Sequence, residues 1–172
     1  MLKILIVEDD ARMAASLKYL IEENAFYNVV GTADDAKSAL SAVDEHDPDV
    51  VLLDLHLARG STGFTVAVKL AELNILCLIV SGKAPQFSMA DLALGLLAKP
   101  FTGDELHCSL ALAEDVLRGR ETLRSKIPAN LTLYRPTDHD ETHEPAYAAA
   151  SLSLKKRAAI RIAHWMEKKL LQ

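Results

Sequence analysis

The chain has 172 residues, which is enough for one domain of ordinary size and a short appendage. Half of the residues are hydrophobic and a quarter are charged, as expected for a globular protein with a substantial core. Its apolar runs fall far short of the roughly 20 residues that a helix needs to cross a bilayer. We therefore expect a cytoplasmic protein with no membrane insertion.

The net charge of −5 is divided unevenly along the chain. Residues 1–119 carry 9 Lys and Arg against 18 Asp and Glu, whereas residues 120–172 carry 10 against 6. Such asymmetry indicates two parts with different partners. A basic tail either meets nucleic acid or docks on an acidic body, and the sequence leaves both readings open.

Short apolar runs alternate with amphipathic runs over the first 119 residues, which predicts alternating strands and helices. The expected strands are residues 2–7, 29–32, 50–53, 76–80 and 94–98. The expected helices are residues 13–23, 34–43, 64–73, 87–92 and 102–117. Asp34 or Asp35 supplies an N-cap for the second helix, and Thr102 with Glu105 forms a capping box for the last one. Because parallel strands need crossover helices, the pattern predicts an α/β fold with a five-stranded parallel sheet covered on both faces.

Five polar residues follow the ends of four predicted strands: Glu8, Asp9, Asp54, Ser81 and Lys99. Ligands of such sheets bind beyond the carboxyl ends of the strands, so we expect these side chains to converge on one rim. Carboxylates gathered there repel one another unless a cation lies between them, and hard cations such as Mg²⁺ prefer oxygen ligands. The sequence therefore predicts magnesium-assisted chemistry at one carboxylate.

Each of these residues suits one part of a phosphoryl transfer. Asp54 ends the central strand, and a carboxylate there can attack a phosphoryl group to form an acyl phosphate. Glu8 and Asp9 can hold Mg²⁺ against the phosphoryl oxygens, because the reaction mainly requires positioning and charge neutralisation. Lys99 can pair with one phosphoryl oxygen, and Ser81 can donate a hydrogen bond to another.

Four segments in this order resemble the receiver domain of bacterial response regulators. They are Ile4-Leu5-Ile6-Val7-Glu8-Asp9-Asp10, Val51-Leu52-Leu53-Asp54-Leu55, Ile79-Val80-Ser81-Gly82 and Lys99-Pro100-Phe101. The resemblance covers residues 1–119. It implies a doubly wound, flavodoxin-like fold with strand order 2-1-3-4-5. It also implies that a sensor histidine kinase or a histidine phosphotransfer protein donates the phosphoryl group.

Carried over position by position, the resemblance implies that Asp54 is the phosphoacceptor. Glu8, Asp9 and Asp54 would bind Mg²⁺, with the backbone carbonyl of His56 as a further ligand. Ser81 would be the switch hydroxyl and Lys99 the lysine that pairs with the phosphoryl group. Self-phosphorylation from a donor and autodephosphorylation, both dependent on Mg²⁺, follow from the same resemblance.

The chain departs from the pattern of the family in two places. Leu96 stands three residues before Lys99, where the family usually has an aromatic residue that turns inward on activation. Only 18 positions separate Ser81 from Lys99, a few fewer than usual, which predicts a short or irregular fourth helix. Because that region commonly forms the active dimer face of the family, both the usual readout and the usual dimer are open questions.

Residues 120–172 lie outside the resemblance. Pro128, Pro136 and Pro145 punctuate residues 120–151, which predicts an irregular linker. Residues 152–172 return to helical periodicity with many Lys and Arg, which predicts a basic amphipathic helix. It packs on the receiver or a second copy, binds a partner, or contacts nucleic acid.

We expect a stand-alone response regulator of a two-component phosphorelay that signals through contacts with an unknown downstream protein or with a second copy of itself. One alternative is a DNA-binding transcriptional regulator that uses the basic tail, with affinity that falls steeply with salt. The other is a constitutive scaffold whose rim binds Mg²⁺ without switching.

Overall fold

The structure, a computed structural model, describes residues 1–85, 89, 91–120 and 127–134. Its elements in chain order are β1 (Leu2–Val7), α1 (Ala11–Glu22), β2 (Tyr27–Ala33), α2 (Ala36–His46), β3 (Val50–Leu53), the 3₁₀ turn η1 (Ala58–Gly60), α3 (Gly63–Glu72), β4 (Leu76–Ser81), β5 (Gly95–Ala98), α4 (Gly103–Leu117) and β6 (Leu131–Leu133). No helix in these ranges is long and apolar enough to span a membrane.

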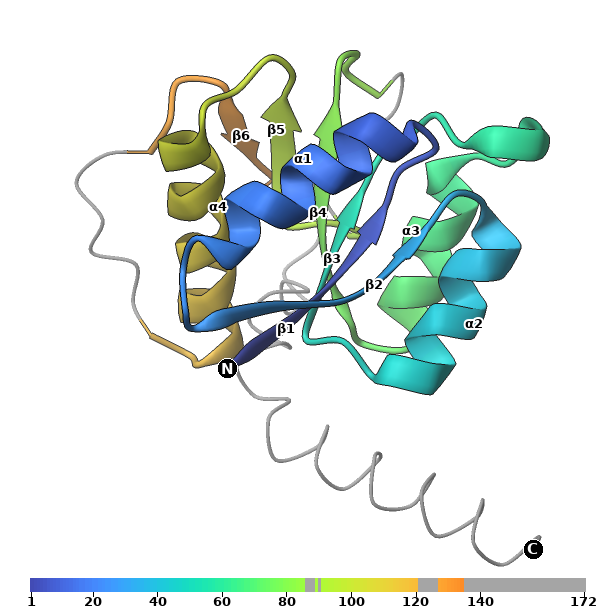
Figure 1. The fold of residues 1–172 in the computed structure, drawn as a ribbon, viewed down its shortest axis with the longest axis horizontal. Helices are drawn as coiled ribbons and strands as arrows, with labels where there is room; N and C mark the ends of the chain where they lie inside the picture. Colours follow the sequence, from blue (N-terminus) through green and yellow to red (C-terminus); the bar gives the residue numbers. More distant parts are fainter. Residues whose placement is uncertain (86–88, 90, 121–126, 135–172) are drawn as a thin grey trace, which may run out of the picture.

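The strands form one sheet in the order β2-β1-β3-β4-β5-β6 (Figure 1). The first five strands pair in parallel, and β6 runs antiparallel to β5. The predicted α/β class and the strand order 2-1-3-4-5 are confirmed, and the structure adds a sixth strand that was not predicted.

Helices cover both faces of the sheet, with α1 and α4 on one face and α2 and α3 on the other (Figure 1). Successive side chains of a strand point to opposite faces, so β1 supplies both cores. Ile4 packs in the core that contains Leu17 of α1, and Leu5 packs in the core that contains Val66 of α3. Because β1 and β3 lie in the middle of the sheet, the residues that follow them are held on a rigid base.

Side-chain caps fix where α1, α2 and α4 begin. Asp10 accepts hydrogen bonds from the first turn of α1, and Asp35 forms a capping box with Ser38 at α2. Thr102 and Glu105 form the predicted capping box at α4. The caps at Asp10 and Asp35 begin helices at the carboxyl end of the sheet, so capping also fixes the loops that surround the rim.

The structure corrects one sequence prediction, and two other predictions lie largely or wholly outside the described residues. Residues 120–151 were predicted to form an irregular linker, but Leu131–Leu133 within them form β6. A strand of three residues has too few positions to show a period, so its pairing with a distant strand left no local signal. The predicted helix at 87–92 lies largely outside the described residues, and the predicted basic helix at 152–172 lies wholly outside them.

Candidate functional site

Three of the predicted site residues meet at the carboxyl ends of β1, β3 and β5. The Nζ atom of Lys99 donates to Glu8 Oε2 at 2.6 Å and to Asp54 Oδ2 at 2.7 Å. Glu8 and Asp54 are 6% and 8% exposed. The ammonium group of Lys99 therefore separates two buried carboxylates that would otherwise repel each other.

Burial and pairing oppose each other in this group. Burial raises the pKa of Glu8 above its ordinary value, although the hydrogen bond and the charge of Lys99 pull it back. For Lys99, burial alone would lower the pKa, but hydrogen bonds to Asp54 and Glu8 and their charges outweigh it, so its pKa is raised. Lys99 therefore stays charged at neutral pH, and its charge favours the ionised form of Glu8 against the effect of burial.

The second oxygen of Asp54 faces the loop that follows β3. Asp54 Oδ1 accepts a hydrogen bond from the backbone N–H of His56 at 3.0 Å, and His56 Nδ1 lies 3.7 Å from the same oxygen. The His56 ring is largely exposed. Asp54 thus has one oxygen held by its own loop and the other by Lys99, which fixes the orientation of its carboxylate.

Ser81 and Asp9 lie on the same rim but outside the three-residue cluster. Ser81 is buried, and its hydroxyl oxygen accepts a hydrogen bond from Lys83 N at 3.5 Å. Its backbone carbonyl accepts from the N–H of Lys99 at 2.9 Å, so the two residues are joined through the main chain. Asp9 is exposed to solvent directly after Glu8.

The donor set fits a hard cation only in part. Within the described residues, no group of three or more His, Cys, Asp and Glu side chains is placed to hold a metal ion. Mg²⁺ commonly takes one or two carboxylates and completes its shell with water and phosphate oxygens, so such a cluster is not required. Glu8 and Asp54 supply the carboxylate oxygens, and Lys99 now lies between them as the neutralising cation.

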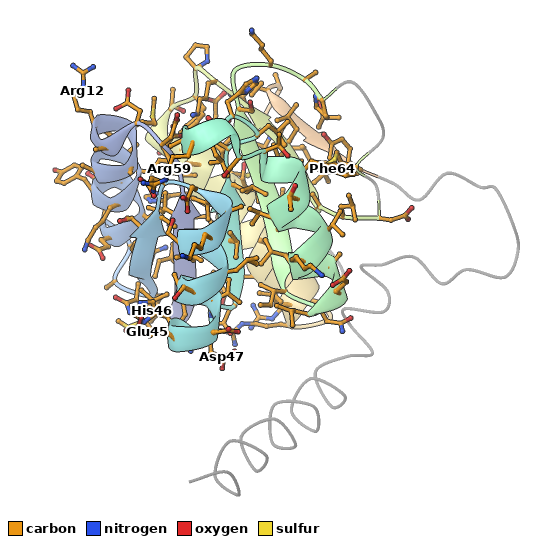
Figure 2. The ribbon with its side chains drawn as sticks, turned by 90° about the vertical axis from the view of Figure 1, so that its right-hand side faces the viewer. Arg12, Glu45, His46, Asp47, Arg59 and Phe64 are labelled. Carbon is orange, nitrogen blue, oxygen red and sulfur yellow. The ribbon has the colours of Figure 1, made fainter. Side chains whose placement is uncertain are left out.

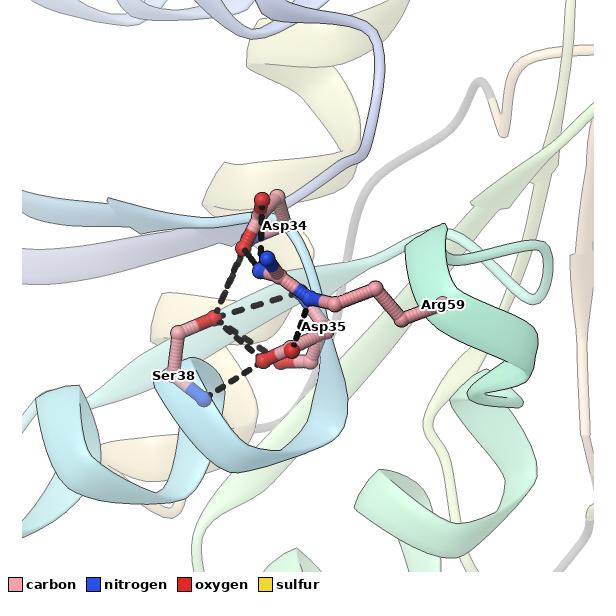
Figure 3. A network of polar contacts seen from close by, with 4 residues as sticks. All are labelled: Asp34, Asp35, Ser38 and Arg59. Atoms are coloured by element: carbon pink, nitrogen blue, oxygen red, sulfur yellow. Dashed lines mark hydrogen bonds and ion pairs between the residues drawn. The ribbon is translucent and has the colours of Figure 1, made fainter.

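An arginine that sequence reasoning did not single out holds the neighbouring loop in place. Arg59 Nε donates to Asp35 Oδ2 at 2.6 Å, and Arg59 Nη2 donates to both oxygens of Asp34 at 2.7 and 2.8 Å (Figure 3). Asp35 Oδ1 accepts from the backbone N–H of Ser38 at 2.7 Å. We call these four residues the Arg59 clamp. It joins the β3–α3 loop to the first turn of α2.

The position and charges of the clamp bear on the site. In Figure 2, Arg59 lies at the opposite end of α2 from His46 and Asp47, which is the end where the strands finish. Hydrogen bonds from Ser38, joined by those and the charge of Arg59, lower the pKa of Asp35 to about 2. Two further rim acids are therefore neutralised by a residue other than Lys99. Arg59 is the only arginine between Arg12 and Arg118, and two adjacent acids at a predicted strand end were the available hint.

The backbone of the same loop packs against Asp54 itself. A Cβ atom at Gly63 would lie 2.2 Å from the carbonyl oxygen of Asp54 and 2.8 Å from Leu55 Cα. Arg59 and Gly60 both have positive φ angles, of 57° and 69°, which is a conformation that costs an ordinary side chain free energy. The loop therefore follows a tightly constrained path that packs the start of α3 against the backbone of Asp54.

The model of the response regulator receiver domain matches residues 4–111. The chain belongs to this family. Its receiver domain is 30% identical over 128 residues to a protein-glutamate methylesterase/protein-glutamine glutaminase of Nitratidesulfovibrio vulgaris, a match that covers 74% of the chain and 34% of the relative. It is 29% identical over 133 residues to the transcriptional regulatory protein PdtaR of Mycobacterium tuberculosis, covering 73% of the chain and 62% of the relative.

Solved structures agree with this assignment. A CheY-like receiver domain protein from Methanospirillum hungatei superposes with a TM-score of 0.61 at 25% identity, covering 67% of the chain and 94% of that structure. The receiver domain of a modulated diguanylate cyclase from Desulfovibrio desulfuricans gives 0.58 at 29% identity, covering 64% and 91%. The chain spans between about a third and just under two thirds of the length of these two curated relatives. A two-component response regulator is the class that these findings support.

Proposed function

We propose that the receiver domain is a phosphoryl-accepting switch in which Asp54 is the acceptor. The observation that carries this proposal is the position of Lys99 Nζ, 2.7 Å from Asp54 Oδ2 and 2.6 Å from Glu8 Oε2. A partly buried cation beside a rigidly held carboxylate is the arrangement needed to stabilise the charge of an incoming phosphoryl group. A histidine kinase or a histidine phosphotransfer protein is the proposed donor, because receiver domains in general interact with such proteins.

The transfer itself forms one bond to phosphorus and breaks another. A carboxylate oxygen of Asp54 attacks the phosphorus atom, the new O–P bond forms, and the N–P bond to the donor imidazole breaks with the electron pair going to that nitrogen. Glu8, Asp9, Asp54 and the carbonyl of His56 are the groups that would hold Mg²⁺, which when bound neutralises the phosphoryl oxygens. The β3 backbone keeps the attacking carboxylate in line, since Val50–Leu53 is fully buried.

The acyl phosphate changes the partners of the surrounding residues. Lys99 loses an oxygen of Asp54 as its partner and pairs with a phosphoryl oxygen, while the hydroxyl of Ser81 donates to another. Because Ser81 is buried and bonded to Lys99 through the main chain, the two residues respond together. The rim then favours a second conformation that a downstream protein or a second copy of the chain recognises.

The direct test is Asp54→Asn, treated with a small-molecule phosphodonor and Mg²⁺ and followed by intact mass. We expect the parent chain to gain one phosphoryl group and the variant to gain none. Asp44→Asn makes the same substitution at an exposed residue of α2 and should take up phosphate like the parent. Uptake by Asp54→Asn would show that the acceptor lies elsewhere.

The DNA-binding alternative rests on the basic character of residues 120–172. One relative is a transcriptional regulatory protein, and the match covers 62% of its length. The alternative predicts retardation of DNA at low salt that weakens steeply as salt rises. An absence of retardation at low salt, with and without phosphorylation, would eliminate it.

A further inference from the structure

The β6 segment, defined here as residues 130–134, occupies the edge of β5 beside the candidate site. The antiparallel pairs are Gly95–Leu133, Leu96–Thr132 and Leu97–Leu131. Beyond them, Ala98 N donates to Asn130 O at 2.9 Å, and Tyr134 N donates to Leu94 O at 3.0 Å. The segment therefore covers the whole length of β5, an edge that would otherwise present unpaired N–H and C=O groups.

Gly95 shows that β5 is fitted to this neighbour. A Cβ atom there would lie 2.4 Å from the carbonyl oxygen of Thr132 and 3.1 Å from Leu133 Cα. Both contacts are with backbone, which cannot rotate away as a side chain can. A larger residue at position 95 is therefore compatible with β5 only when the β6 segment has moved.

Asn130 links the β6 segment to the residue that contacts Asp54. Its Nδ2 atom donates to the carbonyl oxygens of Ala98 and Pro100, both at 3.4 Å, so it contacts the carbonyl groups of the two residues that flank Lys99. The N–H of Lys99 donates to the carbonyl oxygen of Ser81 at 2.9 Å. A displacement of the main chain at Lys99 is therefore passed directly to Asn130.

The β6 segment is seated at a cost. Two buried side-chain polar atoms lack a hydrogen-bond partner among the described residues, Asn130 Oδ1 and Tyr134 Oη, and both belong to this segment. A buried polar atom without a partner has lost its water without a replacement. Release of the segment would return both atoms to solvent. With only three residues in β6, a modest bias is enough to shift its docking equilibrium.

We propose that the β6 segment is the output of the rim, and that transfer of a phosphoryl group to Asp54 releases it from β5. The inference rests on the proposed function. Lys99 Nζ donates to Asp54 Oδ2 at 2.7 Å, so a phosphoryl group on Asp54 changes one of the two partners of Lys99 and displaces its side chain. Asn130 then loses the carbonyl positions to which it is fitted. Residues 135–172 follow the segment directly in the sequence.

Hydrogen exchange of the Tyr134 amide, measured by NMR on the full chain, tests this proposal. With Mg²⁺ alone, the amide is protected by Leu94 O. After addition of beryllofluoride as a phosphoryl mimic, we expect its exchange to accelerate by about tenfold or more. The Leu2 amide, which donates to Phe26 O at the far end of the sheet, should exchange as before. Unchanged exchange at Tyr134 would overturn the proposal.

Intact mass after treatment with a small phosphodonor separates the two levels of failure. Phosphoryl uptake on Asp54 combined with unchanged Tyr134 exchange would overturn the output role of the β6 segment and leave the proposed function standing. No uptake would overturn both.

Two variants probe the docking without phosphorylation. Gly95→Ala should accelerate Tyr134 exchange in the unmodified chain, whereas Gly103→Ala, whose Cβ would meet only the flexible end of Leu20 at 3.3 Å, should not. Tyr134→Phe removes a hydroxyl that has no partner among the described residues and keeps the ring, so it should slow exchange at that amide by a few-fold and reduce the response to beryllofluoride. Faster exchange in Tyr134→Phe would contradict the proposal even if Gly95→Ala failed to fold.

Discussion

The two regions that hold Asp54 in place, the β3–α3 loop and the end of β5 at Lys99, are themselves held in different ways. On one side, the β3–α3 loop is fixed by the Arg59 clamp, in which charged donors and carboxylates meet at 2.6 to 2.8 Å. On the other side, the β6 segment covers β5 through main-chain hydrogen bonds, and its Asn130 side chain contacts the carbonyl oxygens of Ala98 and Pro100 at 3.4 Å. Two buried polar atoms of the segment have no partner among the described residues. Among the described residues, the buried side-chain polar atoms of the clamp all have hydrogen-bond partners, whereas two such atoms of the β6 segment do not.

The difference suggests a division of labour within the rim. A phosphoacceptor needs a fixed carboxylate and fixed metal ligands, because small misplacements are costly in transfer reactions. A switch also needs an element whose two positions differ little in free energy. The clamp supplies the first requirement next to His56, and the β6 segment suits the second next to Lys99.

Two glycines with the same steric problem provide the largest expected contrast. Gly63→Ala would place Cβ 2.2 Å from the carbonyl of Asp54, which directly follows the buried strand β3 and has little room to move, so we expect a loss of about 2–4 kcal/mol in the free energy of unfolding. Gly95→Ala meets Thr132 at 2.4 Å, but the β6 segment can leave, so its loss should be about 1–2 kcal/mol. Urea denaturation measures the free energy of unfolding of both variants. Equal losses would show that the β6 segment is held as firmly as the β3–α3 loop.

Removal of the clamp should weaken metal binding more than it disturbs the fold. Arg59→Ala frees the loop that carries the His56 carbonyl, so we expect Mg²⁺ affinity to fall about tenfold, as for other residues that support metal ligands. Isothermal titration of the chain with Mg²⁺ measures this change. Arg59→Lys keeps the charge without the paired hydrogen bonds, so its Mg²⁺ affinity should lie between those of the parent and Arg59→Ala. Arg12→Ala removes an arginine side chain that is 96% exposed and is the matched control.

A smaller and opposite effect is expected on the other flank. Tyr134→Phe deletes a buried hydroxyl that has no partner among the described residues, so we expect the free energy of unfolding to rise by about 0.5–1 kcal/mol. Chemical denaturation of the variant and the parent under identical conditions gives the difference. A clear loss of stability would mean that the hydroxyl is engaged and that this flank is as well satisfied as the clamp.

The pH dependence of stability should report the clamp as well. Hydrogen bonds from Ser38, with those and the charge of Arg59, depress the pKa of Asp35 from 3.8 to about 2. A carboxyl whose pKa is depressed in the folded state contributes its full stabilisation when the pH is above its unfolded-state pKa. That contribution is lost as the pH falls through the folded-state pKa. Stability should therefore decline between about pH 4 and pH 2. Asp35→Asn should flatten that part of the profile, as followed by circular dichroism during acid titration.

Much of the fold was predictable because its signals are local. The apolar run at Val50–Leu53 gave the central strand, and Thr102 with Glu105 gave the start of the last helix. The meeting of Glu8, Asp54 and Lys99 was also predicted, since carboxyl ends of parallel strands share one edge. Their roles in phosphoryl transfer stay predictions. The absence of a preformed group of metal-binding side chains among the described residues was not foreseen, because Lys99 takes the position between the acids.

The sequence by itself determined the periods of strands and helices, the helix caps and the polar residues that end the strands, since each of these depends on neighbours within a few positions. Only the tertiary structure decided that Arg59 binds acids 24 and 25 positions earlier and that residues 130–134 cover β5. Such contacts join parts of the chain that carry no local mark of each other. They form because the folded sheet brings the β3–α3 loop next to Asp34 and Asp35, and brings β5 next to residues 130–134. The charges and backbone groups of these segments find partners only in the folded chain.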